Sequence, residues 1–256
     1  MAKKNSGTDL KELEKTLLNI GVHLMSAGAN TRRIRTTLER IAGGFGCAID
    51  LLITNRALMI SISDEEGQEI HSSLKRTLPH GVNFRIVSGI SRMSWKILQE
   101  NWSIELINAE VTRLLSLPHY PRIVILSMVS LAGAAFCRLF GGVWLDMIVA
   151  FAATFAGLFI RQELVKRNYN PYMCIFIAAF VSSIIAGLFV KYNDSIQEQA
   201  LTASVLYLIP GVPLINSFSD LIHGNLMNGI VRSVNGLIIA FSIALGLMLA
   251  MHICQL

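Results

Sequence analysis

The stretch Tyr207-Leu-Ile-Pro-Gly-Val-Pro-Leu-Ile-Asn216 lies inside a run that has no Asp, Glu, Lys or Arg from Gln199 to Ser219. A run of this length can cross a bilayer. Pro210 and Pro213 lack a backbone N–H and clash with the carbonyl four residues earlier, which predicts a broken helix. At membrane depth such a break is tolerated where protein or a wet cavity covers the freed carbonyls. Interrupted spans are typical of transporter substrate sites, and a packed structural kink is the alternative interpretation.

The composition divides the chain of 256 residues into a polar part and an apolar part. Charged residues make up only 15% of the chain, against a usual share of about 25%. Residues 1–122 hold 16 of the 22 Lys and Arg and 12 of the 17 Asp and Glu. We therefore expect a small cytoplasmic α+β domain at 1–122 and a transmembrane domain at 123–256. The net charge of +5 is spread thinly, so it does not indicate a nucleic-acid partner.

Several classes of site have no signature in the sequence. The four cysteines are isolated, with no C-x-x-C pair and no ligand-like histidine spacing, so we expect no disulfide framework and no metal site. No Walker loop, G-x-S-x-G elbow or H-E-x-x-H motif is present, and no cofactor is expected. The start, Met1-Ala-Lys-Lys-Asn5, leads into an amphipathic segment, which argues against a cleaved signal peptide.

Five candidate spans follow residue 122, each with roughly the 17–25 residues that a ~30 Å hydrocarbon core requires. They are Ile123–Phe140, Val143–Ile160, Pro171–Val190, the broken Gln199–Asn216, and Ser233–Ile253. Small residues inside them allow close helix approach. The predicted fold is thus an integral membrane all-α bundle of five transmembrane helices with a broken fourth helix, preceded by the α+β domain.

Basic residues near the ends of the spans predict the orientation. Arg113, Arg122, the loop Arg161–Asn168 and Arg232 gather on one side. Since positive residues favour the cytoplasmic side, we expect a multi-pass protein of a bacterial inner membrane with its N-terminus in the cytoplasm. Five spans then place the C-terminus outside.

Two amphipathic helices and a small sheet are expected in the polar domain. The helices run from about Leu10 to Met25 and from a capping Thr31 to Phe45. Alternating residues predict a three-stranded meander over 48–54, 57–63 and 68–73 with a turn at 64–67. Asn83–Val87 is a candidate fourth strand, and 88–100 and 103–117 read as two further helices.

Two minority interpretations concern this domain. A membrane-tethered hydrolase or a sensor is the competing function, with a solvated strand face as the plainer explanation of its polar residues. The residues imagined as nucleophile and base are Ser61, Ser63, His71, Ser72, Ser73 and His80. The arginines at 32, 33, 35 and 40 are expected to form a solvated helix face, and contact with anionic lipid head groups is the alternative.

Several motifs resemble the threonine/serine exporter family in order and spacing from about residue 10 to 250. They are Gly21…Gly28-Ala-x-Thr-x-Arg33, Tyr120-Pro-Arg122, Ile160-Arg-Gln162, Ala203 to Ser217 with its Pro-Gly-x-Pro, and Asp220…Gly224…Gly229…Arg232. The resemblance implies a secondary exporter for small carboxylate metabolites, either a succinate-like dicarboxylate or threonine and serine. It also implies the split form of the family, in which a small membrane protein of four or five spans supplies the second half. Proton coupling is the expected energy source, because no ATP-binding motif is present.

The candidate substrate-binding residues surround the break. The N–H groups after Pro210, Gly211 and Pro213, at the positive end of the following half-helix, suit a carboxylate. Asn216 lies one turn later and can bind substrate or a neighbouring helix. Asp220 shares its face, and we expect a proton-coupling carboxylate there, with a helix cap as the alternative.

Two further pairs of residues are expected at the ends of the spans. Arg138 and Asp146 flank Gly141-Gly142 and could form an ion pair that gates the external mouth or only closes the hairpin. Arg161 and Arg232 lie at the cytoplasmic boundary, as substrate-entry residues or as positive-inside anchors.

Overall fold

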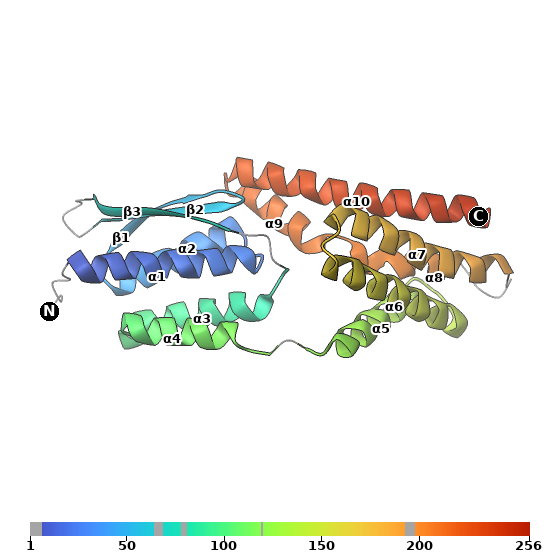
Figure 1. The fold of residues 1–256 in the computed structure, drawn as a ribbon, viewed down its shortest axis with the longest axis horizontal. Helices are drawn as coiled ribbons and strands as arrows, with labels where there is room; N and C mark the ends of the chain where they lie inside the picture. The colour runs from blue at the N-terminus through green and yellow to red at the C-terminus, as the bar shows by residue number, and fades with distance from the viewer. Residues whose placement is uncertain (1–6, 64–68, 78–80, 119, 193–197) are drawn as a thin grey trace. The chain divides into compact units, whose positions relative to one another are not determined.

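The computed structural model describes residues 7–63, 69–77, 81–118, 120–192 and 198–256 (Figure 1). The chain forms two compact units. The first consists of Met1–Pro118 with Val212–Ser233, and the second of His119–Gly211 with Val234–Leu256. Residues 212–233, assigned above to the transmembrane domain, thus belong to the same unit as the N-terminal helices. The division into a cytoplasmic and a transmembrane domain at residue 122 stays a prediction.

The first unit packs helices against one face of a small antiparallel sheet (Figure 1). The strands β1 (Ala48–Ile53), β2 (Ala57–Ser63) and β3 (Glu69–Arg76) form the order β1-β2-β3, so the predicted meander is confirmed. The helices are α1 (Gly7–Ser26), α2 (Thr31–Gly44), α3 (Phe84–Glu100), α4 (Ile104–Leu115), most of α9 (Gly211–Ile222), and the start of α10 (Leu226–Cys254). Alternate residues of β2, namely Leu58, Ile60 and Ile62, are fully buried in the core.

Two predictions in this unit are wrong. Asn83–Val87 is no strand: Asn83 is the N-cap of α3, and its side chain accepts the N–H groups of Arg85 and Ile86. Val87 is buried because it begins a helical stripe that continues through Ile90. The N-cap of α2 is Asn30, not Thr31. The turn predicted at 64–67 lies outside the described residues.

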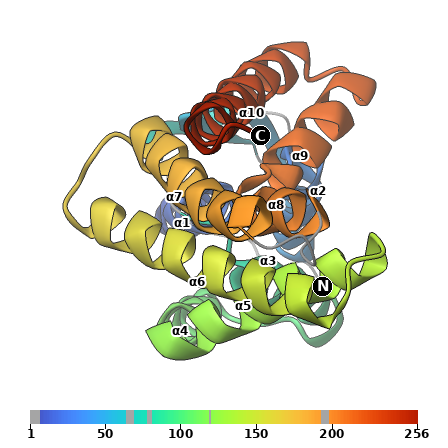
Figure 2. The ribbon, with the colours of Figure 1, turned by 90° about the vertical axis from the view of Figure 1, so that its right-hand side faces the viewer.

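The second unit is a bundle of apolar helices: α5 (Arg122–Leu139), α6 (Trp144–Lys166), α7 (Pro171–Tyr192), α8 (Glu198–Val205), the 3₁₀ helix η1 (Leu206–Leu208) and α10 from Val234 (Figure 2). Among the described residues, α5, α6, α7 and α10 are each long and apolar enough to cross a membrane. There are up to five spans if α8–η1 and α9 count as one broken span. The prediction of a loop over Arg161–Asn168 is wrong for most of these residues, because α6 continues to Lys166.

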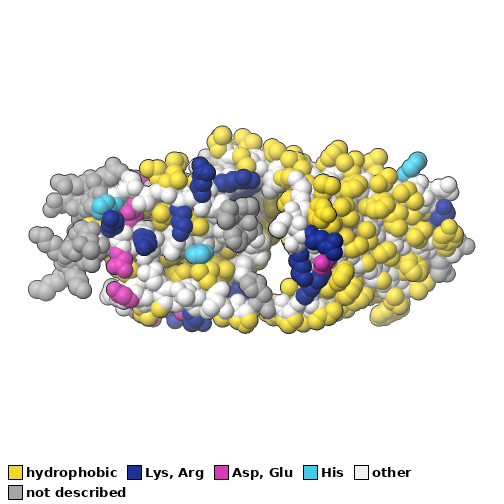
Figure 3. Space-filling model, in the orientation of Figure 1, with side chains coloured by type: hydrophobic (Ala, Val, Ile, Leu, Met, Phe, Trp, Pro, Cys, Tyr) yellow, Lys and Arg dark blue, Asp and Glu magenta, His cyan; other side chains and the backbone are white. Residues whose placement is uncertain are grey.

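Small residues set the spacing of these helices. Alanines at 150, 153, 186, 200 and 203 form one buried cluster. A Cβ on Gly246 of α10 would lie 2.6 Å from the Phe176 carbonyl oxygen of α7, so only glycine permits this approach. On the face drawn in Figure 3, hydrophobic side chains cover most of this unit, with a small group of charged side chains. That surface is typical of helices that face lipid.

Candidate functional site

The broken helix predicted from Pro210 and Pro213 is present: the chain breaks between η1 and α9. Ile209 has the extended backbone angles φ −59° and ψ 127°, and α9 begins at Gly211. Pro213 lies in the first turn of α9, where a missing N–H leaves no intrahelical hydrogen bond unmade. Gly211 has no neighbour within 4 Å of an added Cβ. The Gly211 N–H donates to the Ile209 carbonyl oxygen at 2.9 Å. The first turn of α9 therefore presents the N–H groups of Val212 and Leu214 at the break.

The helices α9 and α10 form a tight hairpin within the first unit. Gly224 ends α9 with a φ of +77°, a conformation that glycine adopts at little cost. Ser217 Oγ donates to the Gly229 carbonyl oxygen at 2.8 Å. A Cβ on Gly229 would lie 2.7 Å from the Leu221 side chain, so this glycine lets α10 approach α9 closely.

The residues Gly28–Thr31 form the turn between α1 and α2, and we name them the 28–31 turn. Gly28 has a φ of +83° and ends α1, with its N–H bonded to the Met25 carbonyl oxygen. Asn30 caps α2 by accepting the Arg33 N–H at 2.8 Å. The carbonyls of the turn and the first N–H groups of α2 need partners from elsewhere in the chain.

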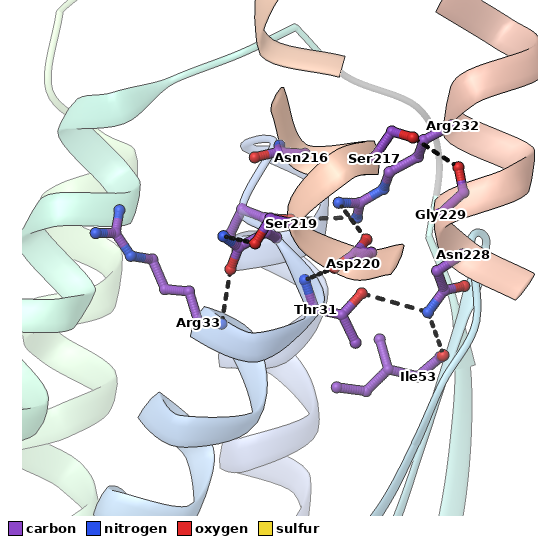
Figure 4. Close-up of polar contacts among 12 residues, drawn as sticks. Thr31, Arg33, Ile53, Asn216, Ser217, Ser219, Asp220, Asn228, Gly229 and Arg232 are labelled. Atoms are coloured by element: carbon purple, nitrogen blue, oxygen red, sulfur yellow. Dashed lines mark hydrogen bonds and ion pairs between the residues drawn. The ribbon is translucent and has the colours of Figure 1, made fainter. Parts of the chain in front are cut away.

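The α9–α10 hairpin supplies these partners, as Figure 4 shows for most of them. Each residue of the 28–31 turn has a polar contact with a hairpin side chain. The contacts are Asn216 Nδ2 to the Gly28 oxygen at 2.8 Å, Arg232 Nη2 to the Ala29 oxygen at 3.3 Å, Asn30 Nδ2 to Ser219 Oγ at 3.4 Å, and the Thr31 N–H to Asp220 Oδ1 at 3.1 Å. Asn228 adds a bond to the Ile53 carbonyl oxygen at the end of β1, at 2.8 Å. Two of the family-like motifs, about 190 residues apart in sequence, thus meet here.

Asp220 and Arg232 form a buried ion pair at the centre of this contact. Arg232 Nη1 lies 2.9 Å from Asp220 Oδ2, and the Asp220 side chain is fully buried while that of Arg232 is 18% exposed. These two atoms are close but not aligned for a hydrogen bond, and neither has another partner among the described residues. The Thr31 N–H and the positive end of α2 also favour a carboxylate here. Asp220 therefore lies between the Thr31 N–H and the Arg232 guanidinium, and its Oδ2 has no hydrogen-bond partner among the described residues.

The other predicted site residues lie elsewhere. Arg161 is part of α6 and is partly exposed. Arg138 donates to the Gly142 carbonyl oxygen at 3.1 Å, and Asp146 accepts the Val143 N–H at 2.7 Å, so both close the α5–α6 connection. Their mutual ion pair stays a prediction.

The residues of the hydrolase interpretation that the structure describes lie on β2 and β3. Ser61 and Ser72 lie opposite each other on β2 and β3 and share a hydrogen bond of 3.0 Å. His71 lies opposite Ile62, and His80 is outside the described residues.

A polar cluster that the residue pattern did not predict lies inside the second unit. Ser182 Oγ of α7 donates to the Ala153 oxygen and is 3.3 Å from the Tyr207 hydroxyl of η1. Thr154 Oγ1 donates to the Ser204 carbonyl oxygen at 3.3 Å. In the sequence, these hydroxyl residues stand at helical spacing among alanines, a pattern that indicates helix packing. Only the tertiary structure shows that they come together beside the break.

Comparison with known proteins gives consistent relatives. The chain matches the family described as "Putative threonine/serine exporter" over residues 15–254. It is 26% identical over 248 residues to the "Probable succinate transporter subunit YjjP" of Klebsiella aerogenes, and 26% identical over 247 residues to the protein of the same name from Escherichia coli; each alignment covers 95% of both chains. No solved structure matches.

A longer relative is also similar. The "Probable threonine/serine exporter" of Mycobacterium tuberculosis is 21% identical over 243 residues, which cover 90% of this chain and 44% of that protein. The match over residues 15–254 takes in both motifs that meet at Asp220 and all the apolar helices. The chain is a multi-pass transport protein that belongs to the threonine/serine exporter family.

Proposed function

We propose that this chain is the larger subunit of a proton-coupled secondary exporter of small carboxylate metabolites. The observation that carries the proposal is the buried Asp220–Arg232 pair at the contact between the hairpin and the 28–31 turn. Burying an ion pair costs desolvation free energy, so a pair that is kept inside this contact is a candidate for a functional role. The relatives' names supply the substrate class: a succinate transporter subunit twice and a threonine/serine exporter once.

The pair offers a simple route to coupling. Arg232 can hold either Asp220 or a substrate carboxylate, which suits guanidinium geometry equally well. Asp220 can hold either Arg232 or a proton. Proton uptake by Asp220 therefore releases Arg232, and the backbone N–H groups after Pro210 provide a second anion contact. In this scheme Pro210, Gly211, Pro213, Asn216, Arg161 and Arg232 are substrate residues and Asp220 is the coupling residue.

The membrane arrangement is part of the same proposal. Five spans, with α8–η1 and α9 as one broken span, keep residues 1–122 in the cytoplasm and put the C-terminus outside, in a bacterial inner membrane. A partner of four or five spans completes the pathway. The word "subunit" in the relatives' names supports a partner, as does the coverage of 44% of the M. tuberculosis protein.

The experiment compares uphill export with exchange in proteoliposomes that contain this chain and its partner. Asp220→Asn keeps the shape and an acceptor for the Thr31 N–H but removes the proton site. We expect the variant to lose uphill succinate or threonine export and to keep substrate exchange, which needs no net proton movement. Asp50→Asn, an exposed position on β1, is the matched control. Uphill export by Asp220→Asn at the original rate would reduce Asp220 to a helix-capping role.

A further inference from the structure

The first unit has a basic cavity that the exporter scheme does not use. It lies between α2 and α3, has a volume of about 270 Å³, and is shallow and largely open to solvent. Its lining is Asn30, Arg32, Arg33, Thr36, Thr37, Arg40, Ser91 and Trp95. Three of these are arginines and none is acidic, so the lining side chains carry a net positive charge.

These arginines lack carboxylate partners. Among the described residues, no Asp or Glu lies within ion-pair distance of Arg32, Arg33 or Arg40. Arg35, on the same helix but outside the cavity, differs in this respect because it lies 3.9 Å from Glu39. Among the arginines of α2, the three without a carboxylate partner are thus the three that line the cavity.

The cavity is also partly preorganised. The Arg40 guanidinium stacks over the Trp95 ring at 3.8 Å and donates to Ser94 Oγ at 2.9 Å. Such contacts reduce the rotamer entropy that an arginine loses when it binds a ligand. Hydroxyl and amide groups of Thr36, Ser91 and Asn30 add neutral donors beside the charges.

We infer that this cavity binds a small dianion, either a phosphate or a dicarboxylate, through Arg32, Arg33 and Arg40. Arginine forks fit both groups with paired hydrogen bonds. The volume is slightly below the usual range of 300–1,000 Å³ for ligand pockets, which favours a small metabolite over a dinucleotide.

Two lining residues connect the cavity to the α9–α10 hairpin. Asn30 bonds Ser219, and Arg32 contacts His223 Nε2 at the end of α9. A dianion that draws Arg32 or Asn30 toward the cavity competes with these contacts. The site is therefore placed to change the contact between the hairpin and the 28–31 turn according to the concentration of the anion.

Tryptophan fluorescence measures anion binding without a transport assay. A negative result would therefore count against the cavity alone and not against the proposed exporter function. Trp102→Phe with Trp144→Phe leaves Trp95 as the sole tryptophan of the chain. The purified full-length protein is titrated in detergent with inorganic phosphate and with succinate at constant ionic strength. We expect a saturable change in Trp95 emission with at least one probe.

Matched variants identify the residues responsible. Arg33→Gln should weaken binding at least tenfold, because one charge-assisted fork is lost. Arg35→Gln removes the same charge from the same helix and should change the Kd less than twofold. Absence of saturation with both probes, or equal weakening by the two variants, would overturn the inference.

A lipid head group also carries a phosphate, so a separate experiment tests lipid as the ligand. The protein is reconstituted in phosphatidylcholine vesicles with and without phosphatidylglycerol. Emission that responds to phosphatidylglycerol, and to neither soluble probe, would assign the cavity to lipid and refute a soluble ligand. Circular dichroism of each variant checks that neither the exposed Arg33 side chain nor the half-buried Arg35 side chain is required for folding.

Discussion

Asp220 accepts the N–H of Thr31 at 3.1 Å, so a residue of α9 satisfies the first turn of a helix that begins 189 residues earlier. Asn30 satisfies a second N–H of the same turn from within the local sequence. The N-terminus of α2 is thus capped by one local and one distant side chain. Because the distant one is also paired with Arg232, a single carboxylate joins the cap of α2 to the α9–α10 hairpin.

The Asp220–Arg232 pair should show strong coupling in stability. Asp220→Ala leaves a mostly buried arginine without its counter-charge, which typically costs about 3–5 kcal/mol. Adding Arg232→Gln should recover part of this loss, since the unpaired charge is gone. Unfolding of the purified single and double variants measures the coupling energy. Additive losses from the two single variants would contradict a direct interaction.

Variants at the break should separate folding from transport. Pro213→Ala restores a donor in the first turn of α9, and Gly211→Ala meets no neighbour within 4 Å, so each should insert at the normal level. If the break only bends a packed helix, Pro213→Ala should also leave export nearly intact. The triple variant with alanine at 210, 211 and 213 should abolish export at an unchanged protein level if the N–H groups of the break bind substrate. Normal export by the triple variant would exclude a substrate role for the break.

Gly157 should be intolerant of any side chain. A Cβ there would overlap Ser182 Oγ and lie 2.5 Å from the Tyr207 hydroxyl and 2.9 Å from the Ala178 oxygen. Gly157→Ala should therefore lower the melting temperature, since overpacking of a close contact costs about 1–3 kcal/mol. Gly43→Ala is the control, because nothing lies within 4 Å of its Cβ position. Equal melting temperatures for the two variants would mean that the helices can separate without cost.

Reporter fusions test the orientation. A reporter inserted between α6 and α7, after Arg167, should be active on the cytoplasmic side, and one fused after Leu256 should be active outside. The physical basis is the set of basic residues at the ends of the spans, which favour the cytoplasm. If the reporter fused after Leu256 is instead active in the cytoplasm, the chain must have an even number of spans.

Local pattern was sufficient for most of the secondary structure. Amphipathic spacing located α1 and α2, alternation located the three strands, and uncharged length located α5, α6, α7 and α10. The prediction of a strand at Asn83–Val87 was wrong because this segment has too few apolar residues to distinguish a period of 2 from a period of 3.6. The Asn83 side chain accepts two N–H groups of α3 and so fixes this segment as the start of a helix.

The sequence by itself determined that the chain has a polar and an apolar part, that a helix breaks at Pro210, and that Asn216, Asp220 and Arg232 are worth testing. Proline chemistry and the cost of charge in hydrocarbon are local properties, so they can be read from residue types. The meeting of the α9–α10 hairpin with the 28–31 turn was decided by the tertiary structure, as were the Asp220–Arg232 pair and the arginine cavity. Those contacts join residues up to 203 positions apart. Their geometry depends on how whole helices pack, which no local period encodes.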